Sequence, residues 1–349
     1  MDFSTFVMYA GFIMAAYSVV GNDVIQTLGT FLSSNEKRPW YVLWIYAGSI
    51  LTFALVYGWM MNDGDVSYGR LLGSGGFEDP AYPMPSPLSW WYLLPPVVLL
   101  TITRFGIPVS TTFLILSFFG TSGVDFSQAD GIFDMLVTFF QAPAFSKMLV
   151  KSLTGYAVAF GAAAIIYILI SKSLEKRFAN SELRLNSNEG RIWTAAQWLS
   201  TGFLWSQWLI QDFANIYAYL PRKVESTEMI ISLGIILGLL AYIFYQRGGA
   251  IQGIVLSKSN TTDIRSATII DFIYGVVLFY FKELNDVPMS TTWVFIGLLA
   301  GRELAVRFRL DEKLSKKTTL NLAGDAGKAS LGLVVSIFLV ILIQILRTS

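Results

Sequence analysis

The chain contains no cysteine and no histidine. Without cysteine it can form neither disulfides nor thiolate metal sites. Without histidine it lacks imidazole metal ligands, the Ser-His and Cys-His pairs of nucleophilic catalysis, and the side chain that most often moves protons near neutral pH. These absences argue against an enzyme, except one that works with carboxylates alone. We therefore predict no catalytic residues and no resident cofactor.

Charged residues are also scarce. Only 14% of the 349 residues are Asp, Glu, Lys or Arg, and 54% are hydrophobic, whereas soluble domains are about 25% charged. The net charge of +1 gives no reason to expect a nucleic-acid partner. The apolar runs approach or exceed the roughly 20 residues that cross a bilayer. We therefore predict a polytopic all-α protein whose surroundings are the lipid bilayer.

The apolar residues fall into ten segments, five in each half of the chain. The predicted domains are a first transmembrane repeat (1–171), a charged cytoplasmic linker (172–191) and a second transmembrane repeat (192–349). Two pairs of short segments, 89–104 with 108–123 and 266–281 with 288–304, fit either full spans or re-entrant hairpins. The segments lie at about 3–33, 41–61, 89–104, 108–123, 147–171, 192–220, 228–246, 266–281, 288–304 and 328–346.

The number of segments and the positions of the cationic residues predict the topology. Five segments per half is an odd number, so the second half would enter the membrane from the opposite side, as in inverted-repeat transporters. Most of the 25 Lys and Arg residues lie on the side opposite the N-terminus. The positive-inside rule therefore predicts a multi-pass protein of the cell (inner) membrane with both termini extracytoplasmic. The cationic segments are 34–40, 104–107, 172–191, 247–265 and 302–328.

Each half carries one polar motif of an amide, an Asp, two further residues and a second amide. Residues three and four apart share a helix face, so each motif presents one carboxylate beside amides. A carboxylate in the bilayer core is costly unless it is paired or hydrated, and carboxylate and amide oxygens suit a hard cation such as sodium. The alternative is a structural contact between helices. The motif residues are Asn22, Asp23 and Gln26, and Gln211, Asp212 and Asn215.

A second motif, Pro, apolar, Ser, Thr, Thr, aromatic, occurs at 108–113 and again at 288–293. Proline is favoured in the first turn of a helix. Hydroxyls and free backbone N–H groups at the positive end of a helix dipole can bind an anion. Two such ends would hold a tetrahedral oxyanion without Lys or Arg, whereas a single copy would be a plain helix cap. The hydroxyl residues are Ser110, Thr111, Thr112, Ser290, Thr291 and Thr292.

At these residues the sequence resembles the inorganic phosphate transporter (PiT) family. That family carries Gly-Ala-Asn-Asp-Val-x-Asn-Ala and a later Pro-x-Ser-Thr-Thr-His in each half. Residues 21–30 are similar to the first signature, with one residue missing before Asn22 and with Gln26 in place of Asn. Residues 211–215 are more divergent and begin with Gln211 in place of Asn. Both Pro-x-Ser-Thr-Thr copies are present, but Phe113 and Trp293 replace the family histidines.

The resemblance implies sodium- or proton-coupled transport of phosphate by an inverted-repeat homodimer with broken helices. Because no histidine is present, we predict sodium as the coupling ion and symport of phosphate or a similar oxyanion by alternating access. Asn22, Asp23, Gln211 and Asp212 are predicted to bind sodium. Gln26 and Asn215 are predicted to join the two Ser-Thr-Thr runs at the substrate. The alternatives are a sulfate permease on the same scaffold and a non-transporting membrane sensor or partner-binding subunit.

Overall fold

The computed structural model describes residues 2–105, 107, 109–170, 178, 183–184, 186–248, 263–284, 286–309 and 316–348. These residues form helices and no strands, so the predicted all-α fold class is confirmed at that level. The division into two inverted repeats of five stays a prediction. The predicted linker lies largely outside the described residues, and so does Pro108.

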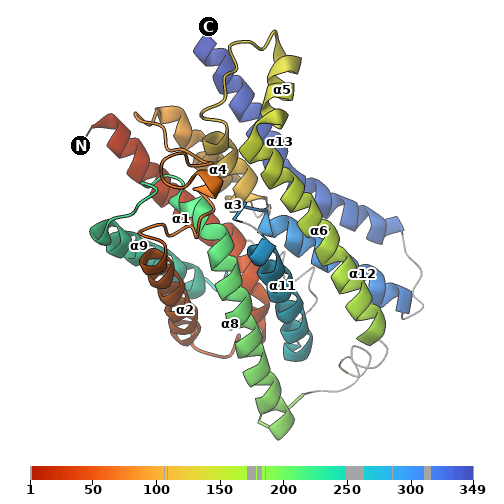
Figure 1. Ribbon diagram of the computed structural model, residues 1–349. Helices are drawn as coiled ribbons and strands as arrows, with labels where there is room; N and C mark the ends of the chain where they lie inside the picture. Colours follow the sequence, from red (N-terminus) through yellow and green to blue (C-terminus); the bar gives the residue numbers. More distant parts are fainter. Residues whose placement is uncertain are drawn as a thin grey trace.

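Long helices make up most of the structure (Figure 1). Five of the described helices are long and apolar enough to cross a bilayer. They are α1 (Phe3–Ser34), α2 (Trp40–Met61), α6 (Pro143–Ile170), α9 (Ser226–Tyr245) and α11 (Ile264–Leu284). The other long helices are α8 (Asn188–Tyr217), α12 (Thr291–Arg309) and α13 (Lys316–Thr348). The short helices are η1 (Gly73–Gly75), η2 (Trp90–Leu93), α3 (Leu94–Arg104), α4 (Thr111–Gly120) and α5 (Ile132–Gln141).

The two pairs of short apolar segments fold differently. Helix α3 has 11 residues and α4 has 10, so each is only about 15 Å long against a bilayer core of about 30 Å. They pack against each other and against α1, as the re-entrant alternative requires. In the second pair, α11 has 21 residues and α12 has 19. Both are long enough to span, but only α11 is also apolar enough along its length.

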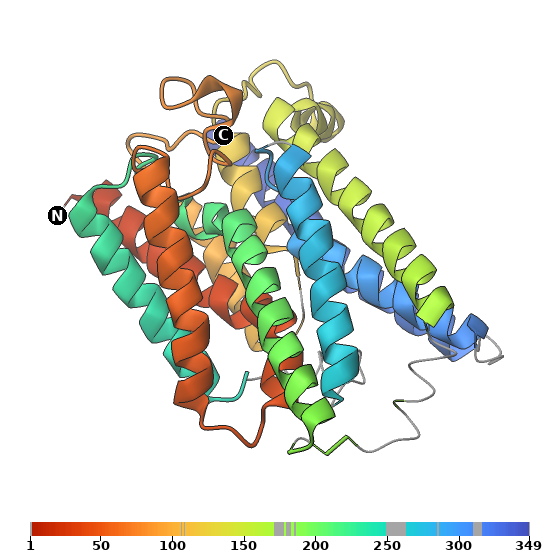
Figure 2. The ribbon, with the colours of Figure 1, turned by 60° about the horizontal axis from the view of Figure 1, so that its bottom comes forward.

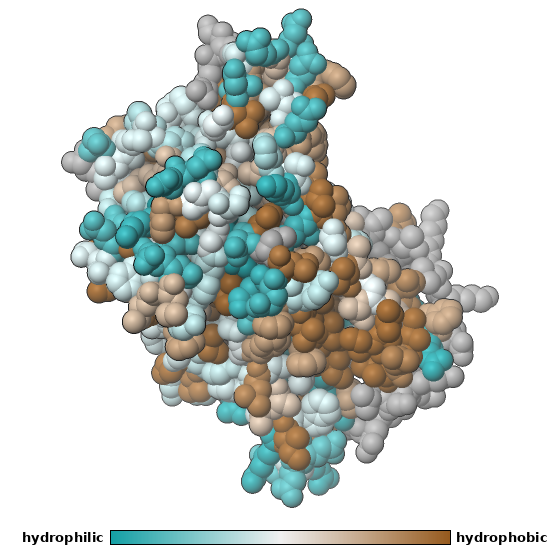
Figure 3. Space-filling view, in the orientation of Figure 1, coloured by the Kyte–Doolittle hydropathy of each residue, from teal (hydrophilic) through white to brown (hydrophobic). Residues whose placement is uncertain are grey.

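The surface agrees with a membrane position. Both termini lie toward the end of the bundle that carries the loop 62–89, while the turn after α1 and the start of α8 lie at the opposite end (Figure 2). Hydrophilic side chains gather at these ends, and apolar ones gather over α6 and its neighbours (Figure 3). On α6, Leu153, Ile165 and Leu169 are exposed. Such a continuous apolar surface suits lipid rather than water.

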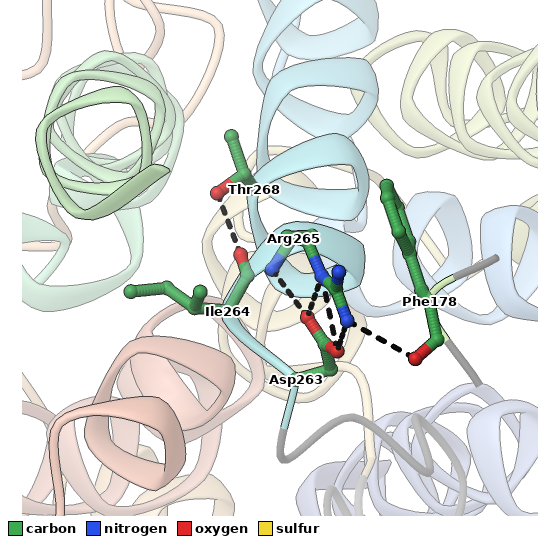
Figure 4. Close-up of polar contacts among 5 residues, drawn as sticks. All are labelled: Phe178, Asp263, Ile264, Arg265 and Thr268. Atoms are coloured by element: carbon green, nitrogen blue, oxygen red, sulfur yellow. Dashed lines mark hydrogen bonds and ion pairs between the residues drawn. The ribbon is translucent and has the colours of Figure 1, made fainter. Parts of the chain in front are cut away.

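The start of α11 is held by a cluster of charged and aromatic groups (Figure 4). The buried Arg265 pairs with Asp263 at 2.6 Å and donates to the carbonyl oxygen of Phe178 at 3.0 Å. Its guanidinium also lies 4.3 Å from the Phe178 ring centroid, as favoured between arginine and aromatic faces. Asp263 in turn accepts the backbone N–H of Arg265 at 2.8 Å. These contacts tie the start of α11 to Phe178.

Helix α12 approaches α6 closely because two glycines face it. A Cβ atom at Gly301 would lie 2.1 Å from the carbonyl oxygen of Phe160, and one at Gly297 would lie 2.5 Å from that of Tyr156. Small residues let membrane helices pack backbone to backbone in this way. The packing sets where the start of α12 lies in the protein.

Replacing Gly301 with alanine should therefore destabilise the protein. Overpacking of this kind costs about 1–3 kcal/mol, so Gly301→Ala should lower the melting temperature of the purified protein in detergent. Gly234→Ala on α9 is the matched control, because no atom lies within 4 Å of the added Cβ. An equal melting temperature for the two variants would show that α6 and α12 do not pack as described.

Candidate functional site

The four polar motifs meet in the interior. Helices α1 and α8 each carry one carboxylate-and-amide motif, and the Ser-Thr-Thr runs form the starts of α4 and α12. Every predicted site residue is buried, with at most 4% of its surface exposed. The structure therefore brings all of them into the same apolar interior. They are Asn22, Asp23, Gln26, Ser110, Thr111, Thr112, Gln211, Asp212, Asn215, Ser290, Thr291 and Thr292.

Asp23 on α1 is surrounded by donors from both halves of the chain. Its Oδ2 accepts the hydroxyl of Thr111 at the start of α4. Its Oδ1 accepts the amide of Asn22 at 2.6 Å and that of Gln26 at 3.3 Å, and the Thr292 hydroxyl approaches it at 3.5 Å. A carboxylate in an apolar interior needs such partners. The starts of α4 and α12 thus supply hydroxyls to a carboxylate on α1.

Asn215 on α8 links the second carboxylate to the same cluster. Its side-chain amide donates to Asp212 Oδ1 at 2.5 Å and to the hydroxyl oxygens of Thr111 and Thr112, both at 3.1 Å. Asp212 and Asp23 are close enough to interact electrostatically. The Thr111 hydroxyl therefore lies between a carboxylate of the first half and an amide of the second.

The serines of the two runs cap their helices. Ser110 Oγ accepts the backbone N–H of Phe113 at 3.2 Å, and Ser290 Oγ accepts that of Trp293 at 3.3 Å, as N-cap serines do. The threonines that follow point to the carboxylates and amides instead. Phe113 and Trp293 pack edge to face, with ring centroids 5.2 Å apart, so the two helix starts touch through these aromatic rings.

Several buried oxygens of the motifs have no hydrogen-bond partner in the described part of the chain. They are Asn22 Oδ1, Gln26 Oε1, Asp212 Oδ2 and Asn215 Oδ1. Buried polar atoms are rarely left without partners in native proteins. Carboxylate and amide oxygens are ligands of hard cations. Among the described residues, no group of three or more His, Cys, Asp or Glu side chains comes together as a metal site.

The sequence analysis missed a third buried carboxylate, Asp271 on α11. It is 1% exposed and accepts the hydroxyls of Thr30 at 2.7 Å and of Thr201 at 2.5 Å. These bonds tie α1, α8 and α11 together. The sequence does place this Asp inside the apolar segment 266–281, where a carboxylate is unusual. Unlike Asp23 and Asp212, however, it is not repeated in the other half of the chain.

Arg70, in the loop 62–89, was also missed. It is 1% exposed, and its Nε donates to Gln211 Oε1 at 3.0 Å. Burial lowers the pKa of Arg70 to about 10, while the carboxylates of Asp286 and Asp212 act in the opposite direction, so the guanidinium is charged at neutral pH. A cation therefore lies beside a site that we expected to contain no Lys or Arg.

Comparisons with known proteins bear on the fold. No protein-family model matches the chain, and no curated protein sequence matches it. A solved structure described as "The sodium-dependent phosphate transporter" aligns with a TM-score of 0.56 over 98% of this chain and 96% of that chain, at 14% identity. The chain has the fold of that transporter. At this identity the likeness concerns the fold alone.

Removing the Thr111 hydroxyl should destabilise the folded protein. Thr111→Val keeps the side-chain shape but leaves Asp23 Oδ2 and the Asn215 amide each short of one partner. Unpaired buried polar groups cost about 1–3 kcal/mol each, so unfolding in detergent should occur at a clearly lower temperature. Thr111→Ser keeps the hydroxyl and should lie much closer to wild type. If the valine variant is as stable as the serine variant, the hydroxyl does not make these bonds.

Proposed function

We propose that the protein is a secondary active transporter that couples the movement of sodium to the uptake of phosphate or a similar oxyanion. The observation that carries the proposal is the set of buried motif oxygens without partners, beside Asp23 and Asp212, where two helix N-termini meet. Such a cluster is costly in an apolar interior unless a ligand completes it. The likeness in fold to a sodium-dependent phosphate transporter supports the same conclusion.

Sodium would bind at the two carboxylate-and-amide motifs. Asn22 and Asp23 would supply oxygens from α1, and Asp212 would supply them from α8. The Gln211 oxygen accepts the guanidinium of Arg70, so Gln211 would join the sodium ligands only if that bond is released. A cation there offsets the carboxylate charge, which otherwise is balanced by donated hydroxyls and amides. Sodium bound to Asp23 would therefore replace part of the stabilisation that the Thr111 and Thr292 hydroxyls give to this carboxylate.

The oxyanion would bind between the starts of α4 and α12. The first N–H groups of a helix have no intrahelical acceptor and lie at the positive end of its dipole. The Ser-Thr-Thr runs add hydroxyls to these N–H groups, and Gln26 and Asn215 add amide donors. Because Thr111 also donates to Asp23, sodium binding would free that hydroxyl for the oxyanion. The shared hydroxyl gives the two ligands a physical reason to bind together.

Alternating access would arise from the two halves, 1–171 and 192–349, as inverted repeats. Helices α1 and α4 belong to the first half and α8 and α12 to the second, so the site lies between the halves. Movement of one half against the other would open it to each side in turn. We propose further that the protein is a homodimer in the cell membrane with both termini extracytoplasmic.

Replacing Asp212 with asparagine should abolish sodium-dependent uptake while the protein still inserts and folds. The neutral side chain keeps its size but cannot offset the charge of a bound cation. The measurement is uptake of labelled phosphate, and in parallel of labelled sulfate, into proteoliposomes with and without a sodium gradient. Asp130→Asn, at an exposed loop carboxylate, is the control and should transport like wild type.

Each other outcome has a definite meaning. Sodium-driven uptake by Asp212→Asn at the wild-type rate would contradict the site assignment. Uptake of sulfate but not phosphate by the wild type would identify a sulfate permease on the same scaffold. If the wild type neither accumulates nor binds either anion in sodium, the protein is not a transporter of these anions, and the non-transporting sensor or partner-binding subunit becomes the better account.

A further inference from the structure

The turn that carries Arg70 is built to hold this side chain in the interior. The Asp65 carboxylate accepts the backbone N–H and the hydroxyl of Ser67 at 2.7 and 2.6 Å, and the backbone N–H of Gly69 at 2.5 Å. The Ser67 hydroxyl oxygen then accepts the backbone N–H of Leu71 at 3.1 Å. Arg70 lies between these anchored residues, so the turn orders the backbone on both sides of it.

The guanidinium of Arg70 is only partly satisfied by the protein. Its Nε donates to Gln211 Oε1 at 3.0 Å, and its Nη1 donates to the carbonyl oxygen of Tyr68 at 3.2 Å. Its Nη2 is buried and has no hydrogen-bond partner in the described part of the chain. An arginine has five N–H donors, and leaving charged donors unpaired in the interior is costly. The unpaired nitrogen is therefore positioned for an acceptor that the chain itself does not provide.

A second basic residue, Lys151 on α6, lies near Arg70. It is 7% exposed, donates to the carbonyl oxygen of Val287 at 2.5 Å, and interacts electrostatically with Arg70 and Asp286. The next residue on α6 accepts, through its hydroxyl, the backbone N–H of Ser290 at 2.9 Å. Lys151 is therefore placed at the approach to the start of α12. The Asp286 carboxylate offsets part of the repulsion between the two basic groups, and a bound anion would offset it further.

The nearby carboxylates do not pair with the unbonded Nη2 of Arg70. Asp286 interacts electrostatically with Arg70 but is exposed, so solvent screens its charge. The Asp65 oxygens already accept the donors of the turn. Arg70 donates to the neutral Gln211, while Asp212 Oδ2 keeps no hydrogen-bond partner. Arg70 interacts with Asp212 electrostatically but makes no hydrogen bond to it. The geometry favours a ligand for Arg70 that comes from outside the chain.

We infer that Arg70 binds the transported oxyanion directly and that Lys151 is the second basic group of this anion site. The inference rests on the proposed function and deepens it. The Arg70 N–H groups match two oxygens of a tetrahedral oxyanion, which favours phosphate or sulfate over chloride. Because the loop 62–89 lies at the end of the bundle with both termini (Figure 2), Arg70 reaches the anion from that side of the site.

The test is equilibrium binding of labelled inorganic phosphate, and of labelled sulfate, to the purified full-length protein at saturating sodium. Arg70→Gln should weaken oxyanion binding by about tenfold or more, as expected for a lost charge-assisted bond. Arg70→Lys, which keeps the charge but not the paired N–H groups, should lose less. The sodium concentration for half-maximal effect should stay close to the wild-type value. Lys223→Gln, at an exposed cation of the same end, is the matched control and should bind like wild type.

Lys151→Met tests the site independently if Arg70→Gln does not fold. It should weaken phosphate binding several-fold without moving the half-maximal sodium concentration. Unchanged oxyanion affinity in the Arg70 variants together with a shifted sodium response would make Arg70 a counter-ion of Asp212 and overturn the inference. Unchanged affinity in both Arg70→Lys and Lys151→Met would also overturn it. Failure of the wild type to bind either oxyanion would instead refute the proposed function.

Discussion

Two carboxylates, Asp23 and Asp212, share the apolar interior, and the rest of the structure is arranged around their need for partners. Each would cost several kcal/mol in the bilayer core if left alone. The hydroxyls of Thr111 and Thr292 reach Asp23 only because α4 and α12 begin inside the protein. Helix α4 begins there because α3 and α4 are short helices that pack against each other. Helix α12 is positioned by its close glycine contact with α6.

The same arrangement offers a physical account of coupling. Thr111 donates to Asp23 and accepts from Asn215, so one hydroxyl belongs to both motifs. A cation bound to Asp23 would neutralise part of its charge and so release the Thr111 and Thr292 hydroxyls. These hydroxyls lie at the two helix starts, which suit an anion. Binding of one ligand then favours the other, and by thermodynamic reciprocity the effect must be equal in both directions.

Much of this site could be predicted from the sequence because polar residues within apolar segments are rare, and here they recur in matching order. Helical spacing placed Asp23 and Gln26 on one face, and the Ser-Thr-Thr runs predicted helix starts. Arg70 could not be predicted, since its burial depends on the turn built by Asp65 and on the distant Gln211. Nor could apolar length alone show that the segments 89–104 and 108–123 form helices of only 11 and 10 residues, because short and full-length apolar helices have similar compositions.

The central claim is that a cation and an oxyanion bind together at the meeting point of the four motifs. The most direct measurement is the dissociation constant of phosphate or sulfate for the purified protein, with sodium or with choline as the only added cation. The account predicts that saturating sodium tightens oxyanion binding by about tenfold or more, within the usual range of coupling between sites. Equal dissociation constants in sodium and in choline would contradict it.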